Sequence, residues 1–166
     1  GRHRSRFELV AGRREVAPGV FLLCDIGSAH ARPRGNRRLW AERDGRLERD
    51  PFDHELMMVV REEGGIVVLT GCSHHGVLNM LDAATAAFPG LPVKGLVGGF
   101  HLIGLPFYDS MAASRREVET IGRRILEQVA GPVVTGHCTG GKGYRALAGV
   151  MGKALRPLAT GSVIEA

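Results

Sequence analysis

Residues 67–81 read VVLTGCSHHGVLNML, and they give the clearest indication of the fold. Apolar and β-branched residues run as far as Thr70, a glycine interrupts them, and two adjacent histidines follow before apolar residues recur at helical spacing. A strand followed directly by a helix is the repeating unit of α/β proteins. The stretch therefore predicts a strand whose carboxyl end carries Cys72, His74 and His75.

The same alternation extends over most of the chain. Apolar runs of strand length occupy residues 19–26, 56–60, 66–70, 93–98, 132–135 and 162–165. Helical patterns lie between several of them, at residues 76–88, 112–130 and 143–155. We therefore predict an α/β fold, with a mixed, mainly parallel sheet and the three helices on one face. The segment LMMVVREEGGIVVLT predicts a β-hairpin within that sheet, because a charged Gly-Gly turn separates its two apolar runs.

Composition narrows the class of protein. The chain has 166 residues, of which 44% are hydrophobic and 23% charged, and this is typical of one globular domain. No apolar stretch approaches the ~20 residues of a membrane span, so we do not expect a membrane partner. Three cysteines are too few for a disulfide framework and fit a reducing compartment. We expect a cytoplasmic protein.

The net charge of +5 is concentrated at the front of the chain. Residues 1–38 contain nine arginines against three acidic residues, and residues 28–50 are polar and interrupted by Pro33, Gly35 and Gly45. We interpret residues 1–50 as an Arg-rich arm or connection with one strand, followed by the main domain at 51–166. Few aromatic residues accompany the arginines, so we do not expect nucleic acid as a partner.

Four of the seven histidines follow predicted strands. His74 and His75 follow the strand that ends at Thr70, His101 follows residues 93–98, and His137 follows residues 132–135. The carboxyl ends of strands in an α/β sheet collect ligand sites, and imidazole is the commonest metal ligand. Each histidine could instead be a polar loop residue with its own partner. Three strand ends that each supply a histidine favour a metal site of His74, His101 and His137, with His75 pointing elsewhere.

The other histidines and the thiols have lesser predicted roles. His3, His30 and His54 lie in polar surroundings and are not assigned to the site. His137 and Cys138 are adjacent, and adjacent side chains of an extended chain point in opposite directions. A closed Cys2His2 zinc site is therefore sterically awkward, and we interpret Cys72 and Cys138 as packing residues or as support for the ligands.

The stretch GHCTGGKG at residues 136–143 resembles a phosphate-binding P-loop but departs from it. Gly143 stands where the magnesium-binding hydroxyl of that motif belongs, so a nucleotide site is not predicted. Backbone N–H groups of Gly140, Gly141 and Lys142 at a helix start could still bind an anion such as a substrate phosphate. The alternative is a Gly-rich turn with Lys142 in solvent.

Successive motifs of the chain resemble a known family. DPFDHELMMVV, VVLTGCSHHGVLNML, VKGLVGGFHL, VVTGHCTG and ATGSVIEA are similar to motifs of the metallo-β-lactamase-fold hydrolases, specifically the dihydropterin methyl ribofuranosylaminobenzene phosphate synthase-like branch. The resemblance covers about residues 18–166. It implies an αββα sandwich of two similar halves, with one or two metal ions, zinc above all, at the edge between the sheets. By this resemblance His74 and His137 match metal ligands, and His101 stands near a position that many relatives fill with a bridging aspartate.

The chain departs from this family in its first half. The H-x-H-x-D-H signature is absent, and Asp82, the next acid after the paired histidines, falls inside a predicted helix. The chain therefore resembles the C-terminal half of such a protein, with the other half on another polypeptide or missing. A half-sandwich leaves one apolar sheet face uncovered, so we expect a partner segment, a partner chain or self-association.

The resemblance and the absence of the H-x-H-x-D-H motif leave two functional hypotheses. In the first, the chain is part of a metal-dependent hydrolase-like enzyme that acts on a small phosphate-bearing or pterin-related substrate, and His101 is a ligand or moves the proton. In the second, it is a non-catalytic or truncated half-domain that needs a segment carrying H-x-H-x-D-H. Two or three imidazoles without a carboxylate leave a divalent ion short of ligands. We therefore expect the isolated chain to bind metal poorly and to be catalytically weak.

Overall fold

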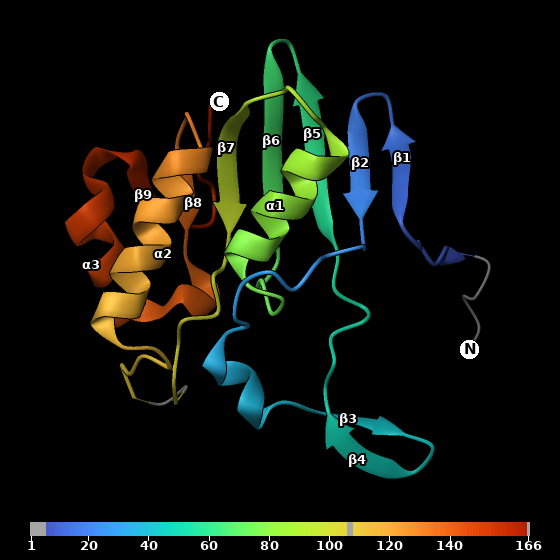
Figure 1. The fold of residues 1–166 in the computed structure, drawn as a ribbon, viewed down its shortest axis with the longest axis vertical. Coiled ribbons are helices and arrows are strands. Elements are labelled where there is room, and N and C mark those ends of the chain that lie inside the picture. Colours follow the sequence, from blue (N-terminus) through green and yellow to red (C-terminus); the bar gives the residue numbers. More distant parts are fainter. Residues whose placement is uncertain (1–5, 106–107, 166) are drawn as a thin grey trace.

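The computed structural model, which describes residues 6–105 and 108–165, is built around a seven-stranded mixed sheet (Figure 1). Its strands, in spatial order, are β1 (Arg13–Ala17), β2 (Val20–Leu23), β5 (Met57–Glu62), β6 (Gly65–Thr70), β7 (Val93–Gly98), β8 (Val133–Thr135) and β9 (Leu155–Pro157). The pairs from β1 to β6 are antiparallel, and those from β6 to β9 are parallel. A separate hairpin consists of β3 (Trp40–Arg43) and β4 (Arg46–Arg49).

The hairpin predicted over residues 56–70 is confirmed. Strands β5 and β6 pair in antiparallel register from Met57 opposite Thr70 to Glu62 opposite Gly65. Only Glu63 and Gly64 connect them, and Gly64 has a φ of 78°, which a glycine adopts without steric cost. This hairpin places β6 in the centre of the sheet, with its carboxyl end at the edge where β7 and β8 also end.

Three α-helices accompany the sheet, α1 (Val77–Ala87), α2 (Arg115–Gln128) and α3 (Gly140–Met151). A capping box starts α2, because the Ser114 hydroxyl accepts the Glu117 N–H and the Glu117 carboxylate accepts the Ser114 N–H. Helices α1 and α2 lie over one face of the sheet (Figure 1), and all three helices contribute to one core. Within the described ranges, no helix is long and apolar enough to cross a membrane.

The two faces of the sheet differ in burial. One cross-strand row packs under the helices and is fully buried, and it contains Phe21, Val59, Val68, Leu96, Val133 and Leu155. The row on the opposite face contains Leu22, Met58, Leu69 and Val97, all partly exposed, together with the buried Val134. Because strand side chains alternate between faces, this second row is an apolar surface that the helices do not cover.

The predicted mixed α/β sheet with helices on one face is confirmed, while several details are wrong. Parallel and antiparallel pairs are equal in number rather than mainly parallel. Residues 162–165 form no strand, and the last strand is β9. Helix α3 begins at Gly140 rather than at the predicted residue 143, directly after the 3-10 turn at residues 137–139. Residues 1–50 were expected to contain one strand, whereas the described part of this segment contains β1 to β4 and the 3-10 helix η2 (Arg34–Arg38).

A candidate metal centre at the strand ends

Three loops meet at the carboxyl ends of the central parallel strands. The loop after β6 carries Cys72 and His74, the loop after β7 carries His101, and the turn after β8 carries His137 and Cys138. Because β6, β7 and β8 are parallel neighbours, their carboxyl ends lie along one edge of the sheet. The sheet topology therefore gathers the residues that the sequence analysis assigned to the site.

Buried hydroxyl groups tie the loops together. The Ser73 hydroxyl donates to the Gly99 carbonyl at 2.7 Å, and the Thr135 hydroxyl donates to the Gly98 carbonyl at 2.7 Å. The Thr139 hydroxyl accepts the Phe100 N–H at 3.0 Å. All three hydroxyl residues are buried, so these bonds satisfy backbone groups that water cannot reach. The loops are thus fixed relative to one another.

Backbone strain collects at the same loops. Ser73, His101 and His137 have φ values of 59°, 46° and 51°, in the left-handed region that residues other than glycine seldom occupy. Each such residue costs of order 1–3 kcal/mol, and the surrounding structure must hold it in place. One strained residue in each of the three loops indicates that the backbone here fixes the directions of the side chains and that this lowers the stability of the folded chain.

His74 is held in a defined tautomer. The Asn36 amide group donates to the His74 carbonyl at 2.7 Å, so its oxygen faces His74 Nδ1, at 3.1 Å. The Nδ1 atom therefore carries the proton, and Nε2 keeps its lone pair. The ring of Phe52 stacks on His74 with the ring centroids 4.1 Å apart and the planes 9° from parallel. Burial lowers the pKa of His74, which favours the neutral imidazole that a metal requires.

His101 lies beside His74, with the ring centroids 4.3 Å apart. Both ring nitrogens of His101 are buried, and neither has a hydrogen-bond partner among the described residues. Burial, followed by the nearby His74, lowers the pKa of His101 to about 4, so the imidazole is neutral at pH 7. A Cβ atom placed on Gly35 would lie 2.8 Å from His101 Nε2, so η2 packs directly against this ring.

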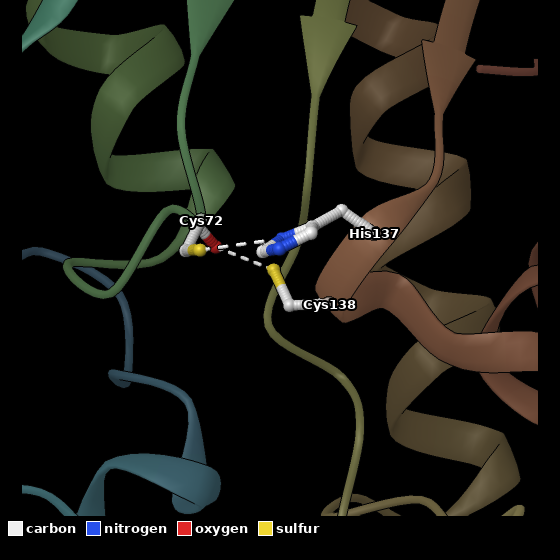
Figure 2. A group of neighbouring side chains, drawn as sticks. All are labelled: Cys72, His137 and Cys138. Carbon is white, nitrogen blue, oxygen red and sulfur yellow. Dashed lines mark hydrogen bonds between the residues drawn. The ribbon is translucent and has the colours of Figure 1, made fainter. Parts of the chain in front are cut away.

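His137 lies among the thiols of Cys72 and Cys138 (Figure 2). The Cys72 sulfur lies 3.5 Å from His137 Nδ1, and one ligand atom from each of the three residues lies within 4.8 Å of the others. The expectation that His137 and Cys138 point in opposite directions is wrong, because they lie in the 3-10 helix η3 (His137–Thr139) rather than in an extended strand. His137 is exposed and Cys138 is buried. Burial, followed by the neighbouring Cys72, raises the pKa of the Cys138 thiol to about 12.

His75 occupies a different environment from His74. It is buried, and its Nδ1 lies 2.8 Å from Oε2 of the buried Glu55. The Glu55 carboxylate also accepts the backbone N–H groups of His74 and His75, at 2.6 and 2.7 Å. His75 and Glu55 thus form an internal pair that fixes the loop of His74.

The predicted anion site at the start of α3 has an internal occupant. The Asp109 carboxylate accepts the Lys142 N–H at 3.0 Å and pairs with Arg145 at 2.5 Å. The hydrogen bond from Arg145 is the main reason that the pKa of Asp109 is lowered. A Cβ atom on Gly141 would lie 3.2 Å from both side chains. A substrate anion bound by Gly140, Gly141 and Lys142 would therefore have to displace Asp109.

The remaining described histidines belong to other segments, although His54 lies near Phe52, the ring that stacks on His74. His30 Nε2 lies 2.9 Å from Asp82 on α1, and His54 is exposed. His3 lies outside the described residues. The sequence alone assigned no role to Asn36, Phe52 or Glu55, although Phe52 and Glu55 belong to the DPFDHELMMVV motif.

The donors at this edge fit a divalent metal ion. His74 presents an unprotonated Nε2, His101 presents buried nitrogens without partners, and His137 stands between two thiols. Neutral imidazole and thiolate are the donors that zinc prefers. Among the described residues, the group whose ligand atoms all lie within 4.8 Å of one another is Cys72, His137 and Cys138, and the adjacent rings of His74 and His101 are not part of it.

The chain has a metallo-β-lactamase-like fold. No family model matches the sequence. The structure is similar to the crystal structure of a metal-dependent hydrolase of the β-lactamase superfamily, with a TM-score of 0.72 and 29% identity, over 95% of this chain and 57% of that one.

The particular resemblance is to a pterin-related synthase. The 7,8-dihydropterin-6-methyl-4-(beta-D-ribofuranosyl)-aminobenzene-5'-phosphate synthase of Methanocaldococcus jannaschii is 28% identical over 130 residues, which are 76% of this chain and 42% of the synthase. An uncharacterized protein of the same organism is 29% identical over 63 residues, 38% of this chain. The chain spans about half the length of the hydrolase and of the synthase.

Proposed function

We propose that this chain carries part of the active site of a metal-dependent hydrolase that acts on a small phosphate-bearing substrate. The observation that carries the proposal is the position of His74, His101 and His137 on the three loops that follow the neighbouring parallel strands β6, β7 and β8. The similarity to a metal-dependent hydrolase at 29% identity supports it. The pterin-related synthase favours a phosphate-bearing or pterin-related substrate over a peptide or a lipid.

The residues of the site have separate roles in this proposal. His74 would hold zinc through Nε2, because Asn36 engages Nδ1, and His137 would hold it from the opposite loop. A divalent ion supplies Lewis acidity and lowers the pKa of a water molecule from about 15.7 to about 7. His101, with a pKa of about 4, is neutral at pH 7 and offers a lone pair as a further ligand or as an acceptor for a proton.

A cavity of about 560 Å³ beside the site suits an anionic substrate with an apolar body. Five arginines and one glutamate line it, namely Arg32, Arg34, Arg37, Arg116, Arg124 and Glu117. Its apolar wall consists of Val77, Leu78, Phe100, Leu102, Ala113 and Ile121. Guanidinium groups bind phosphate in a bidentate manner, and the apolar wall can receive a ring.

The cavity and the histidines share one segment of chain. Pro33, Arg34 and Arg37 line the cavity, while Gly35 and Asn36, between them, contact His101 and His74. A substrate whose phosphate rests among the arginines would therefore lie against the segment that orients the histidine rings. This proximity supports the cavity, rather than the start of α3, as the principal phosphate site.

A second proposal is that the chain needs a partner to complete its active site and to cover its sheet. The chain lacks H-x-H-x-D-H, and the outer sheet face exposes parts of Leu22, Met58, Leu69 and Val97. We propose that a segment carrying the missing motif, or a second copy of this chain, covers that face. In the absence of such a partner the chain would be a weak enzyme or a non-catalytic half-domain. We place it in the cytoplasm, where its three cysteines would remain reduced.

The experiment measures zinc content and phosphomonoester hydrolysis by the purified chain. We expect slow turnover that falls at least tenfold in His74→Ala and in His137→Ala, since loss of a ligand weakens metal binding. The matched control is His54→Ala, which removes an exposed histidine outside the three loops. Turnover that survives both ligand substitutions would refute the hydrolase proposal. Full zinc occupancy with rapid turnover by the chain alone would refute the need for a partner.

A further inference from the structure

Cys72, His137 and Cys138 form a cluster whose two thiols have no role in the histidine site. The Cys72 sulfur lies 3.5 Å from His137 Nδ1, and one donor atom from each residue lies within 4.8 Å of the others. Figure 2 shows the three side chains pointing toward one another from the turns after β6 and β8. We infer that these residues form a thiolate-containing metal site, with two sulfur ligands and one nitrogen ligand. The inference rests on the proposed function only in that both use His137.

The spacing fits a tetrahedral ion. Zinc–sulfur bonds of about 2.3 Å and zinc–nitrogen bonds of about 2.0–2.1 Å place tetrahedral ligand atoms about 3.5–3.8 Å apart. The sulfur-to-nitrogen distance of 3.5 Å already lies in this range. The limit of 4.8 Å on the remaining distances calls for movements of about 1 Å or less. His137 is exposed, so the fourth position can face solvent, as in catalytic sites with two cysteines and one histidine.

The backbone is shaped so that adjacent residues can both act as ligands. The left-handed φ of 51° at His137 and the 3-10 turn after it bring the side chains of His137 and Cys138 to the same point. A Cβ atom on Gly99 would lie 2.6 Å from the Cys138 sulfur, so only glycine leaves room for this thiol. The His101 N–H donates to the same sulfur at 3.3 Å. A hydrogen bond of this kind supports a thiolate ligand.

Donor chemistry predicts which ions bind. Soft thiolates select zinc, cobalt and cadmium over magnesium, calcium and manganese, which prefer oxygen donors. A site made only of histidines would bind cobalt without producing a sulfur-to-metal charge-transfer absorption. The presence or absence of that absorption therefore separates this inference from the histidine site of the proposed function.

The test is a cobalt titration of the reduced chain, followed by the near-ultraviolet charge-transfer absorption of cobalt thiolates. We expect a band that saturates at one equivalent of cobalt, that zinc abolishes and that excess magnesium leaves unchanged. Cys72→Ser and Cys138→Ser should each remove about half of the band and weaken cobalt binding at least tenfold. The matched control is Cys24→Ser, because the Cys24 thiol donates to the Val10 carbonyl, away from the cluster. This variant should retain the whole band.

Two further measurements keep the inference open to refutation. Cys138 is buried, so Cys138→Ala is tested beside Cys138→Ser, with far-ultraviolet circular dichroism to show that each variant folds. In the parent chain, zinc should protect two of the three thiols from alkylation. Cobalt binding without the band, a band that survives loss of both cysteines, or a Cys72–Cys138 disulfide in place of metal binding would each overturn the inference. A loss of hydrolysis in His74→Ala with the band intact would concern only the proposed function.

Discussion

Replacement of Glu55 by alanine should destabilise the chain more than any surface change. The Glu55 carboxylate is 9% exposed and accepts three hydrogen bonds, from the N–H groups of His74 and His75 and from the His75 ring. Hydrogen bonds to a charged group contribute about 1.5–3 kcal/mol each, but three bonds to one carboxylate are not additive. Glu55→Ala leaves buried N–H groups without an acceptor, each at a cost of about 1–3 kcal/mol, so we expect a total loss of about 3–5 kcal/mol in the free energy of unfolding.

Thermal unfolding followed by circular dichroism measures this effect. At about 2–4 °C per kcal/mol for a chain of this size, the midpoint should fall by on the order of 10 °C. Glu55→Gln keeps one acceptor oxygen, so its free energy of unfolding should fall by less, about 1–3 kcal/mol. Glu127→Ala, the same substitution at an exposed position of α2, should change stability by no more than about 0.5 kcal/mol. If the free energy of unfolding of Glu55→Ala lies within about 1 kcal/mol of that of the parent chain, Glu55 does not fix the loop of His74.

Three other perturbations test the site from different sides. Asn36→Ala removes the group that fixes the tautomer of His74 and should lower metal affinity about 10- to 100-fold with little effect on stability, as measured by metal titration and unfolding. The metal-free chain should lose stability as the pH falls from 6.5 toward 4, because His101 has a lower pKa in the folded chain and therefore takes up its proton first in the unfolded chain. His101→Gln should flatten this part of the plot of stability against pH. Gly98→Ala places a Cβ atom 2.1 Å from the Thr70 hydroxyl oxygen at a φ of 151°, so it should abolish cooperative unfolding.

Each of these predictions has an internal control. Arg38→Ala changes an exposed residue of the same turn as Asn36 and should leave metal affinity unchanged. Gly71→Ala adds a Cβ atom with no heavy atom within 4 Å, so it should fold normally where Gly98→Ala does not. A pH profile that is the same with and without His101 would contradict the assignment of that titration. A folded Gly98→Ala would show that β6 and β7 can separate at their ends.

The central strands could be predicted because their sequences are apolar on both faces. Strands β5 to β8 read as continuous apolar runs, and each is found close to the predicted place. Strands β1, β3 and β4 were missed because every residue of β1 and β4, and most of β3, is exposed, so these strands contain no continuous apolar run. One signal for the β3–β4 hairpin was present. The Asp44-Gly45 dipeptide has φ values of 50° and 74°, and Asp-Gly is a preferred pair for a two-residue hairpin turn.

The candidate site could be predicted only as far as its strand ends. A histidine after a strand is visible in the sequence, whereas its orientation depends on residues far away along the chain. Asn36 lies 38 positions before His74, and nothing in the run RGNRR distinguishes it from a surface polar residue. Tertiary contacts of this kind are set by how segments pack, which the period of the sequence does not encode.

The thiols show how a local assumption can hide a site. Adjacent residues of an extended strand point to opposite faces, so the sequence alone predicts that the side chains of His137 and Cys138 diverge. In the structure Gly136, just before them, leaves the strand, His137 takes the left-handed conformation, and the chain turns tightly through Thr139. A histidine in that conformation costs of order 1–3 kcal/mol, and at this position the cost brings both side chains toward Cys72. The strain at His137 thus directs two adjacent donors to one point, and a metal ion bound there would offset part of its cost.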